Sequence, residues 1–88
     1  MRVEVKLPFL SEEIEYCRVL RWLVVPGQTV EIDQDLAELQ VGEETFLFPS
    51  PVDGRVVEIL APAGAMVVTD EVLLIIEEEP DGRKELSL

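Results

Sequence analysis

Short runs of apolar and β-branched residues, separated by polar breaks, cover most of the chain and predict β-strands. In residues 2–7, Val3, Val5 and Leu7 alternate with polar residues, as in a strand with one buried face. Similar runs predict strands at residues 17–25, 29–32, 45–48, 55–60, 66–68 and 72–76. Proline, glycine and aspartate lie between these runs and indicate turns. The pattern therefore favours an all-β fold built from short strands.

Residues 36–40 are ambiguous, because leucine, alanine, glutamate and glutamine all favour helices. Asp35 and Gly42 bound this segment too closely for a helix of average length, so we expect a strand. Residues 45–48 form the next predicted strand, and the polar break Gly42-Glu43-Glu44 joins the two as a hairpin. Residues 9–15 are acidic and short, and we expect a loop there with at most one turn.

The two halves of the sequence repeat each other at an offset of thirty-seven positions. Six identical pairs fall within residues 19–40 and their counterparts: Val19 and Val56, Leu23 and Leu60, Gly27 and Gly64, Val30 and Val67, Asp33 and Asp70, Leu36 and Leu73. The same offset pairs Phe9-Leu10 with Phe46-Leu47 upstream. Repetition at this period indicates a duplicated supersecondary unit. We therefore expect two short sheets packed face to face with quasi-two-fold symmetry, the central hairpin and the chain ends lying at opposite ends.

Composition narrows the classes of function. The chain of 88 residues fits one domain, expected at residues 1–79 and followed by a flexible charged tail at residues 80–88. Its net charge of −12 argues against nucleic acid and anionic membranes as partners. The charge suits either contact with basic protein surfaces or solubility alone. No signal peptide or membrane-spanning run is present, so a cytoplasmic location is expected.

Few residues could carry chemistry. The chain has no histidine and a single cysteine, Cys17, which argues against a zinc site, a metal site of similar type or a histidine-based catalytic group. Cys17 is expected to be a small, inert packing residue, with a reactive acyl-carrying thiol as the less favoured alternative. Trp22 is expected in the core or on a strand face. The adjacent acids Glu43 and Glu44 lie on a turn with no pocket to tune their acidity, so no catalytic residues are expected.

Residues 6–8, 19–30, 38–40 and 48–56 together resemble the lipoyl domains of dihydrolipoamide acyltransferases. These domains are the swinging-arm carriers of 2-oxo acid dehydrogenase complexes, and biotinyl domains share their fold. The similarity covers about residues 3–77 without a gap. It implies a flattened β-barrel sandwich, or barrel-sandwich hybrid, with the two-fold symmetry expected from the repeat.

The resemblance also implies an attachment site. Members of the family carry lipoate as an amide on a lysine at the tip of the central hairpin, usually between aspartate and alanine. Here the three positions hold Gly42, Glu43 and Glu44, so a carboxylate stands at the acceptor position. Lys6 lies in the first predicted strand and Lys84 in the tail, and the biotinyl Ala-Met-Lys-Met motif is absent. We therefore expect no cofactor at this pseudo-attachment hairpin. In the alternative, in which the chain is an acyl carrier, lipoate would be the cofactor.

The expected function is a non-catalytic interaction or docking module. The family's loop beside the hairpin helps partners recognise the domain, so the candidate recognition residues are Phe9, Leu10, Ser11, Glu12, Glu13, Glu43 and Glu44. The candidate partners are components of a 2-oxo acid dehydrogenase complex or a lipoate ligase. Three alternatives stay open: a functional acyl-carrier domain or subunit of such a complex, a structural adaptor of an unrelated assembly, and a relic in which Glu43 reflects drift.

Overall fold

The computed structural model describes residues 1–79, and this part of the chain is all β. The expected tail at residues 80–88 lies outside the described residues. Two four-stranded antiparallel sheets have the orders β1-β8-β6-β3 and β5-β4-β2-β7. The strands are β1 (Arg2–Lys6), β2 (Tyr16–Trp22), β3 (Thr29–Val30), β4 (Asp35–Val41), β5 (Glu44–Pro49), β6 (Gly54–Ile59), β7 (Met66–Val68) and β8 (Val72–Glu78). The expected flattened sandwich of two sheets is confirmed.

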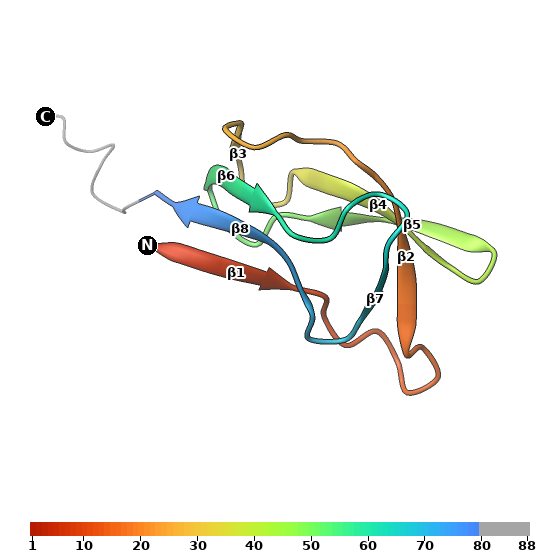
Figure 1. The fold of residues 1–88 in the computed structure, drawn as a ribbon. Coiled ribbons are helices and arrows are strands. Elements are labelled where there is room, and N and C mark those ends of the chain that lie inside the picture. The colour runs from red at the N-terminus through yellow and green to blue at the C-terminus, as the bar shows by residue number, and fades with distance from the viewer. Residues whose placement is uncertain (80–88) are drawn as a thin grey trace, which may run out of the picture.

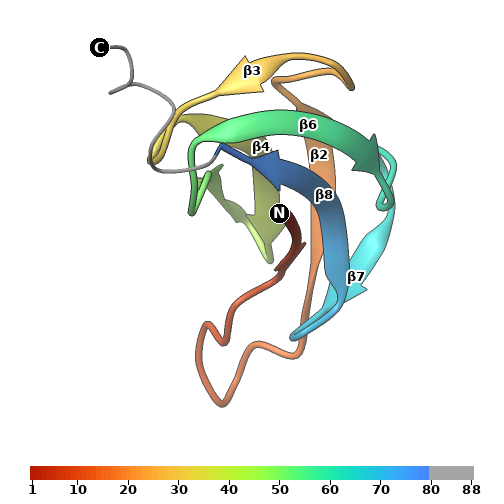
Figure 2. The same cartoon turned by 90° about the vertical axis from the view of Figure 1, so that its left-hand side faces the viewer.

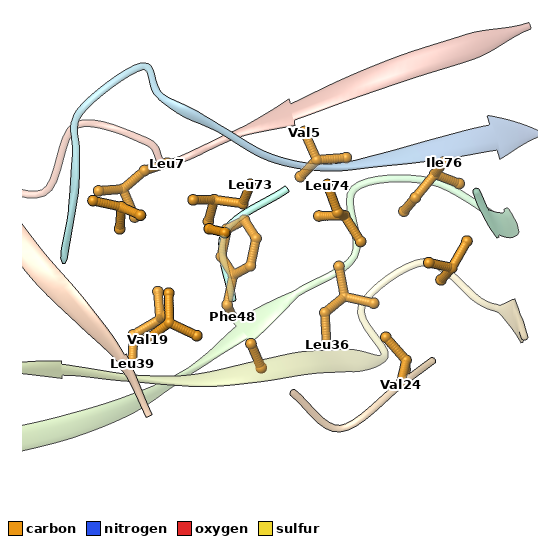
Figure 3. Packing of buried hydrophobic residues seen from close by; sticks show 14 of the residues in the cluster. Val5, Leu7, Val19, Val24, Leu36, Leu39, Phe48, Leu73, Leu74 and Ile76 are labelled. Atoms are coloured by element: carbon orange, nitrogen blue, oxygen red, sulfur yellow. The ribbon is translucent and has the colours of Figure 1, made fainter. Parts of the chain in front are cut away.

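The core lies between the sheets and is filled from both of them (Figure 3). Its largest fully buried side chains are leucines and one isoleucine from β4, from β8 and from the residue after β1: Leu7, Leu36, Leu39, Leu73, Leu74 and Ile76. The alternating residues Val3, Val5 and Leu7 face this core as expected, with Val3 partly buried. Burial of apolar surface on the inner faces is the main term that holds two such sheets together.

The quasi-two-fold symmetry is visible in the backbone. Gly27 and Gly64, thirty-seven positions apart, have φ values of +93° and +94°. Asp33 and Asp70, again thirty-seven apart, have φ values of +70° and +72° and are the only non-glycine residues with positive φ in the described part of the chain. Equal turns at equal places show that the repeated sequence builds a repeated structure.

Equivalent hydrogen bonds extend one strand pair in each sheet. The Gly27 N–H donates to the Val56 carbonyl at 2.7 Å. Its symmetry counterpart runs from the Gly64 N–H to the Val19 carbonyl at 2.6 Å. The strand order follows the same rule, because β5, β4, β2 and β7 in one sheet correspond to β1, β8, β6 and β3 in the other.

The upstream part of the predicted repeat is wrong. Phe9 and Leu10 lie in the loop after β1, whereas Phe46 and Leu47 lie within β5. The loop between β1 and β2 is longer than the one between β5 and β6, so β1 and β5 are offset by 43 positions instead of thirty-seven.

Hydrogen bonds at the ends of β1 and β5 establish the new offset. Leu7 N–H donates to the Glu71 carbonyl at 2.9 Å, and Ser50 N–H donates to the Gln34 carbonyl at 2.8 Å. Since Glu71 is the counterpart of Gln34, Leu7 is the counterpart of Ser50. The gapless match of Phe9-Leu10 to Phe46-Leu47 is therefore a coincidence of sequence.

The predicted strands are confirmed, with shifted ends. Residues 36–40 form β4 despite their helix propensity, because pairing with β2 and β5 on both sides outweighs it. The run at residues 17–25 stops being strand at Trp22, where the chain crosses to the other sheet to form β3. Figure 1 shows the β4–β5 hairpin at one end of the molecule and the start of β1 with the end of β8 at the other. Figure 2 shows β6 and β8 curving side by side.

Candidate functional site

The β4–β5 hairpin closes through a two-residue turn. Val41 pairs with Glu44, which leaves Gly42 and Glu43 as the two central residues. Gly42 has a φ of +59°, and Glu43 is not among the residues with positive φ. A positive φ at the first central position alone is the requirement of a type II′ turn, which glycine meets without strain. No atom lies within 4 Å of where a Cβ would sit on Gly42, so its backbone conformation, not a lack of space, favours glycine here.

The tip of the hairpin is presented to solvent. Gly42, Glu43 and Glu44 are all exposed. Neither carboxylate forms an ion pair with any residue from 1 to 79. Glu43 is therefore free to meet another molecule, and its position is the one that the resemblance assigns to the attachment site.

The loop after β1 lies beside this hairpin. Its centre is a turn in which the Ile14 N–H donates to the Ser11 carbonyl at 3.1 Å and the Glu13 N–H donates to Ser11 Oγ at 3.2 Å. No helix forms there, as expected. Ser11 therefore organises the loop, and its side chain is partly buried.

Two shallow depressions join the loop to the hairpin. One, of about 240 Å³, brings Leu10 and Ile14 together with Val41, Glu44 and Phe46. The other, of about 210 Å³, lies between Glu13, Ile14 and Glu15 on the loop and Val41 and Gly42 on the hairpin. The carboxylates of Glu13, Glu15 and Glu44 line these depressions without a lysine or arginine.

The predicted recognition residues divide into two groups. Leu10, Glu13 and Glu44 line the depressions beside the turn, and Glu43 lies at its tip. Phe9, Ser11 and Glu12 line neither depression, although Phe9 is 66% exposed and Glu12 is also exposed.

Sequence reasoning missed Ile14 and Val41, which line both depressions. The available signal for Ile14 was an apolar residue between acidic neighbours in a loop. Val41 was visible only as the last apolar residue before the turn. Their shared role depends on the loop folding back against the hairpin.

The residues at the turn do not fit a lipoyl amide. Such an amide needs an amine, and Gly42, Glu43 and Glu44 offer only carboxylates. Lys6 lies on β1, away from the turn. A metal does not fit better, because residues 1–79 contain no group of three or more His, Cys, Asp or Glu side chains arranged to hold one. The same residues include no helix long and apolar enough to cross a membrane.

Cys17 and Trp22 belong to the packing. Cys17 is 1% exposed, and its burial raises the pKa of the thiol, which disfavours the thiolate. Trp22 packs against the core, and its indole N–H donates to the Ala61 carbonyl at 2.7 Å. The expected packing roles of both residues are confirmed.

Comparison with known proteins gives the family to which the chain belongs. The family model for biotin/lipoyl domains, described as "Biotin-requiring enzyme", matches residues 3–76. The chain is 34% identical over 84 residues to a dihydrolipoyllysine-residue acetyltransferase component of the pyruvate dehydrogenase complex from Staphylococcus epidermidis, covering 96% of this chain. It is 35% identical over 77 residues to the corresponding component from Staphylococcus aureus, covering 88% of this chain. The chain spans only 19% and 18% of the length of these two relatives.

Solved structures agree on the fold. The lipoyl domain of the 2-oxoglutarate dehydrogenase complex from Azotobacter vinelandii has a TM-score of 0.72 and 24% identity, covering 89% of this chain and 99% of that one. A single-chain, multi-domain long-chain acyl-CoA carboxylase has a TM-score of 0.71 and 14% identity, covering 96% of this chain and 8% of that one. With a family model matching almost the whole chain and the same flattened sandwich in both comparisons, the chain belongs to the biotin/lipoyl domain family.

Proposed function

We propose that this chain is a lipoyl-type domain that is not lipoylated at its hairpin and that acts as a non-catalytic docking module. The observation that carries the proposal is the exposed two-residue turn with Glu43 at its tip. A carboxylate cannot form the amide that a lipoate ligase makes, and it reverses the charge at the attachment position. The domain thus keeps the fold of a carrier, but the side chain of Glu43 cannot form the amide that attaches lipoate.

The proposed partners are components of a 2-oxo acid dehydrogenase complex or a lipoate ligase, met in the cytoplasm. Two observations support this choice. The similar staphylococcal proteins are acetyltransferase components of a pyruvate dehydrogenase complex. The loop with Leu10 and Glu13 lies beside the hairpin, which gives a partner one continuous surface to contact.

The second candidate is a functional acyl carrier, which the attachment role of the family favours. In that case lipoate would be attached at a residue other than Glu43, and Lys6 is the only lysine in the described residues. Its position on β1 is unlike a turn tip, so the ligase would need a different approach.

Intact-mass measurement after co-expression with a lipoate ligase separates the two candidates. The docking proposal predicts the unmodified mass, while a lipoyl domain with the usual acceptor lysine, expressed in the same cells, gains the lipoyl group. A lipoyl adduct on this chain would sink the proposal. Affinity capture from the source organism then tests docking: components of a 2-oxo acid dehydrogenase complex or a lipoate ligase should be enriched over an unrelated acidic domain, and no enrichment would favour a relic.

A further inference from the structure

An apolar groove runs between strands β1 and β5, the facing edges of the two sheets. It encloses about 620 Å³. Its apolar lining includes Val3 and Val5 from β1, Phe46 and Phe48 from β5, and Leu10 from the loop. Val5 and Phe48 are almost fully buried, and Val3 and Phe46 are partly buried, so the groove opens directly onto the core. We call this feature the β1–β5 groove.

Strand β5 presents unpaired backbone groups to the groove. At its end, Ser50 N–H donates to the Gln34 carbonyl at 2.8 Å, and the Ser50 carbonyl accepts from Asp33 N–H at 2.7 Å. Both backbone groups of Ser50 thus face the β4 side. Because this direction alternates along a strand, Leu47 and Thr45 direct their N–H and C=O groups away from β4. Among the described residues β5 pairs with β4 alone.

The middle of β5 lacks the usual protection of an edge strand. Natural edges are blunted by charged residues, prolines or bulges. Here Glu44 and Pro49 lie at the two ends, and the four residues between them, 45–48, include no charge and no proline. The bulge in this strand pair lies on β4, at residues 35–37. Leu47 lines the groove and is 49% exposed, and alternation along β5 puts its side chain on the face opposite Phe46. The edge is therefore open to an added strand.

The surroundings of the groove are acidic. The groove shares Leu10 and Phe46 with the depression beside the loop, which in turn shares Ile14 and Val41 with the one at the turn. Their combined lining carries five carboxylates and one cation: Glu4, Glu13, Glu15, Asp33 and Glu44 against Lys6. A second copy of this chain would bring another net charge of −12, so self-pairing at this edge is opposed by repulsion.

We propose that the β1–β5 groove binds an extended, basic segment of a partner protein, which adds as a strand to the free edge of β5. Apolar side chains at alternate positions of that segment would enter the groove toward Val3 and Phe46. Lysines or arginines of the segment would meet the acidic surroundings of the groove, which include Glu4 and Glu44. β5 has six residues and a length of roughly 20 Å, which suits a segment of similar size. The inference rests on the proposed docking function and supplies its surface and the chemistry of its partner.

The first experiment uses a synthetic peptide that alternates valine and lysine, added to the full chain and followed by backbone amide NMR. We expect saturable shifts at Thr45 and Leu47 and at groove residues such as Val3 and Phe46. We also expect slower hydrogen exchange of the Thr45 and Leu47 amides. A peptide that alternates valine and glutamate is the control and should bind at least about tenfold more weakly, since it meets like charges.

Two variants at one position separate strand addition from side-chain contact. Leu47→Pro removes only an amide directed away from β4, a place where edge strands tolerate proline. Leu47→Ala keeps that amide and removes the outward side chain. We expect Leu47→Pro to weaken peptide binding about tenfold or more through lost main-chain pairing, and Leu47→Ala to stay within about twofold. The amide spectrum of each free variant establishes that it is folded; if Leu47→Pro does not fold, Thr45→Pro, which removes the other outward amide, replaces it.

A matched pair of charge reversals tests the acidic surroundings. Glu44→Lys lies beside the groove, and Glu58→Lys lies on β6, whose residues do not line it. Both change the net charge equally, and we expect only Glu44→Lys to weaken binding of the valine–lysine peptide, by about threefold or more. Equal effects of the two reversals would mean nonspecific attraction and would overturn the proposal.

Three further results would also overturn it: no shifts in the groove, Leu47→Pro binding like the unaltered chain, or a concentration-dependent dimer that protects the Thr45 and Leu47 amides without peptide. The intact mass of the same sample distinguishes failure of the groove proposal from failure of the proposed docking function. A lipoylated chain refutes the docking proposal whatever the peptide does. If the chain is unmodified and does not bind the peptide, only the proposal that the groove is the docking surface is refuted.

Discussion

Single positions set the shape and the charge of the β4–β5 turn. Gly42 meets the positive φ that the two-residue turn requires, so the hairpin keeps its shape. Glu43 follows it at the exposed tip, the position that the resemblance assigns to the acceptor. In the proposed function, a carboxylate at this tip changes what the turn can react with, while Gly42 keeps the backbone that presents it.

Gly54 is a residue where glycine is required by close packing. A Cβ there would collide with the Glu77 carbonyl oxygen and lie 2.8 Å from Cγ2 of Ile76. We predict that Gly54→Ala lowers the free energy of unfolding by about 1–3 kcal/mol through overpacking. Urea unfolding followed by circular dichroism measures this. Glu58→Ala, an exposed change in the same strand, should stay within about 0.5 kcal/mol. Equal stability of Gly54→Ala and the unaltered chain would contradict the close approach of β6 and β8.

At the scale of elements, the sequence predicts what is local. All eight strands are expected from the alternation of residues and from the turn signals, including β4, where the close bounds Asp35 and Gly42 outweigh helix propensity. The hairpin that carries Glu43 is expected for the same reason. The end of β2 depends on where the chain crosses to the other sheet. The offset of 43 between β1 and β5 depends on the length of the loop after β1. No local pattern encodes these features.

The two turns that contain Asp33 and Asp70 test the symmetry of the elements. Both residues are left-handed, with φ of +70° and +72°, a conformation that β-branched residues adopt at a cost. We predict that Asp33→Val and Asp70→Val each destabilise the fold by about 1–2 kcal/mol, and by similar amounts. Thermal or urea unfolding measures both. Asp35→Val removes the same charge from a residue in a strand and should not show this cost. A loss at only one of the two turns would argue against equivalent backbone strain.

The whole molecule combines a symmetric scaffold with an asymmetric surface. The two halves build equivalent sheets, but only one of the two related ends carries the β4–β5 hairpin with the loop beside it (Figure 1). The candidate recognition residues could be named from sequence because they lie in two short segments. The β1–β5 groove could not, because its sides come from strands that are distant in the chain and unpaired with each other.

The net charge of −12 should make the whole fold sensitive to salt. Self-repulsion destabilises a compact acidic chain, and raising salt from 0.01 to 0.15 M shortens the Debye length from about 30 to about 8 Å. We predict that the urea midpoint rises over this range and that Glu58→Lys, with less negative charge, shows a smaller rise. A midpoint that falls with salt would mean that favourable pairs, such as Arg21 Nε with Glu38 Oε1 at 2.9 Å, dominate instead.

The most direct test restores the missing amine. The double variant Gly42→Asp with Glu43→Lys gives the turn the residues that carriers use before and at the acceptor position. Intact mass after co-expression with a lipoate ligase reads the outcome, and Glu43→Gln serves as a variant that removes the carboxylate without supplying an amine. We predict a single lipoyl adduct at position 43 in the double variant and none in the unaltered chain or in Glu43→Gln. An unmodified double variant, beside a control lipoyl domain that is fully modified, would contradict the claim that this hairpin retains the family's attachment address.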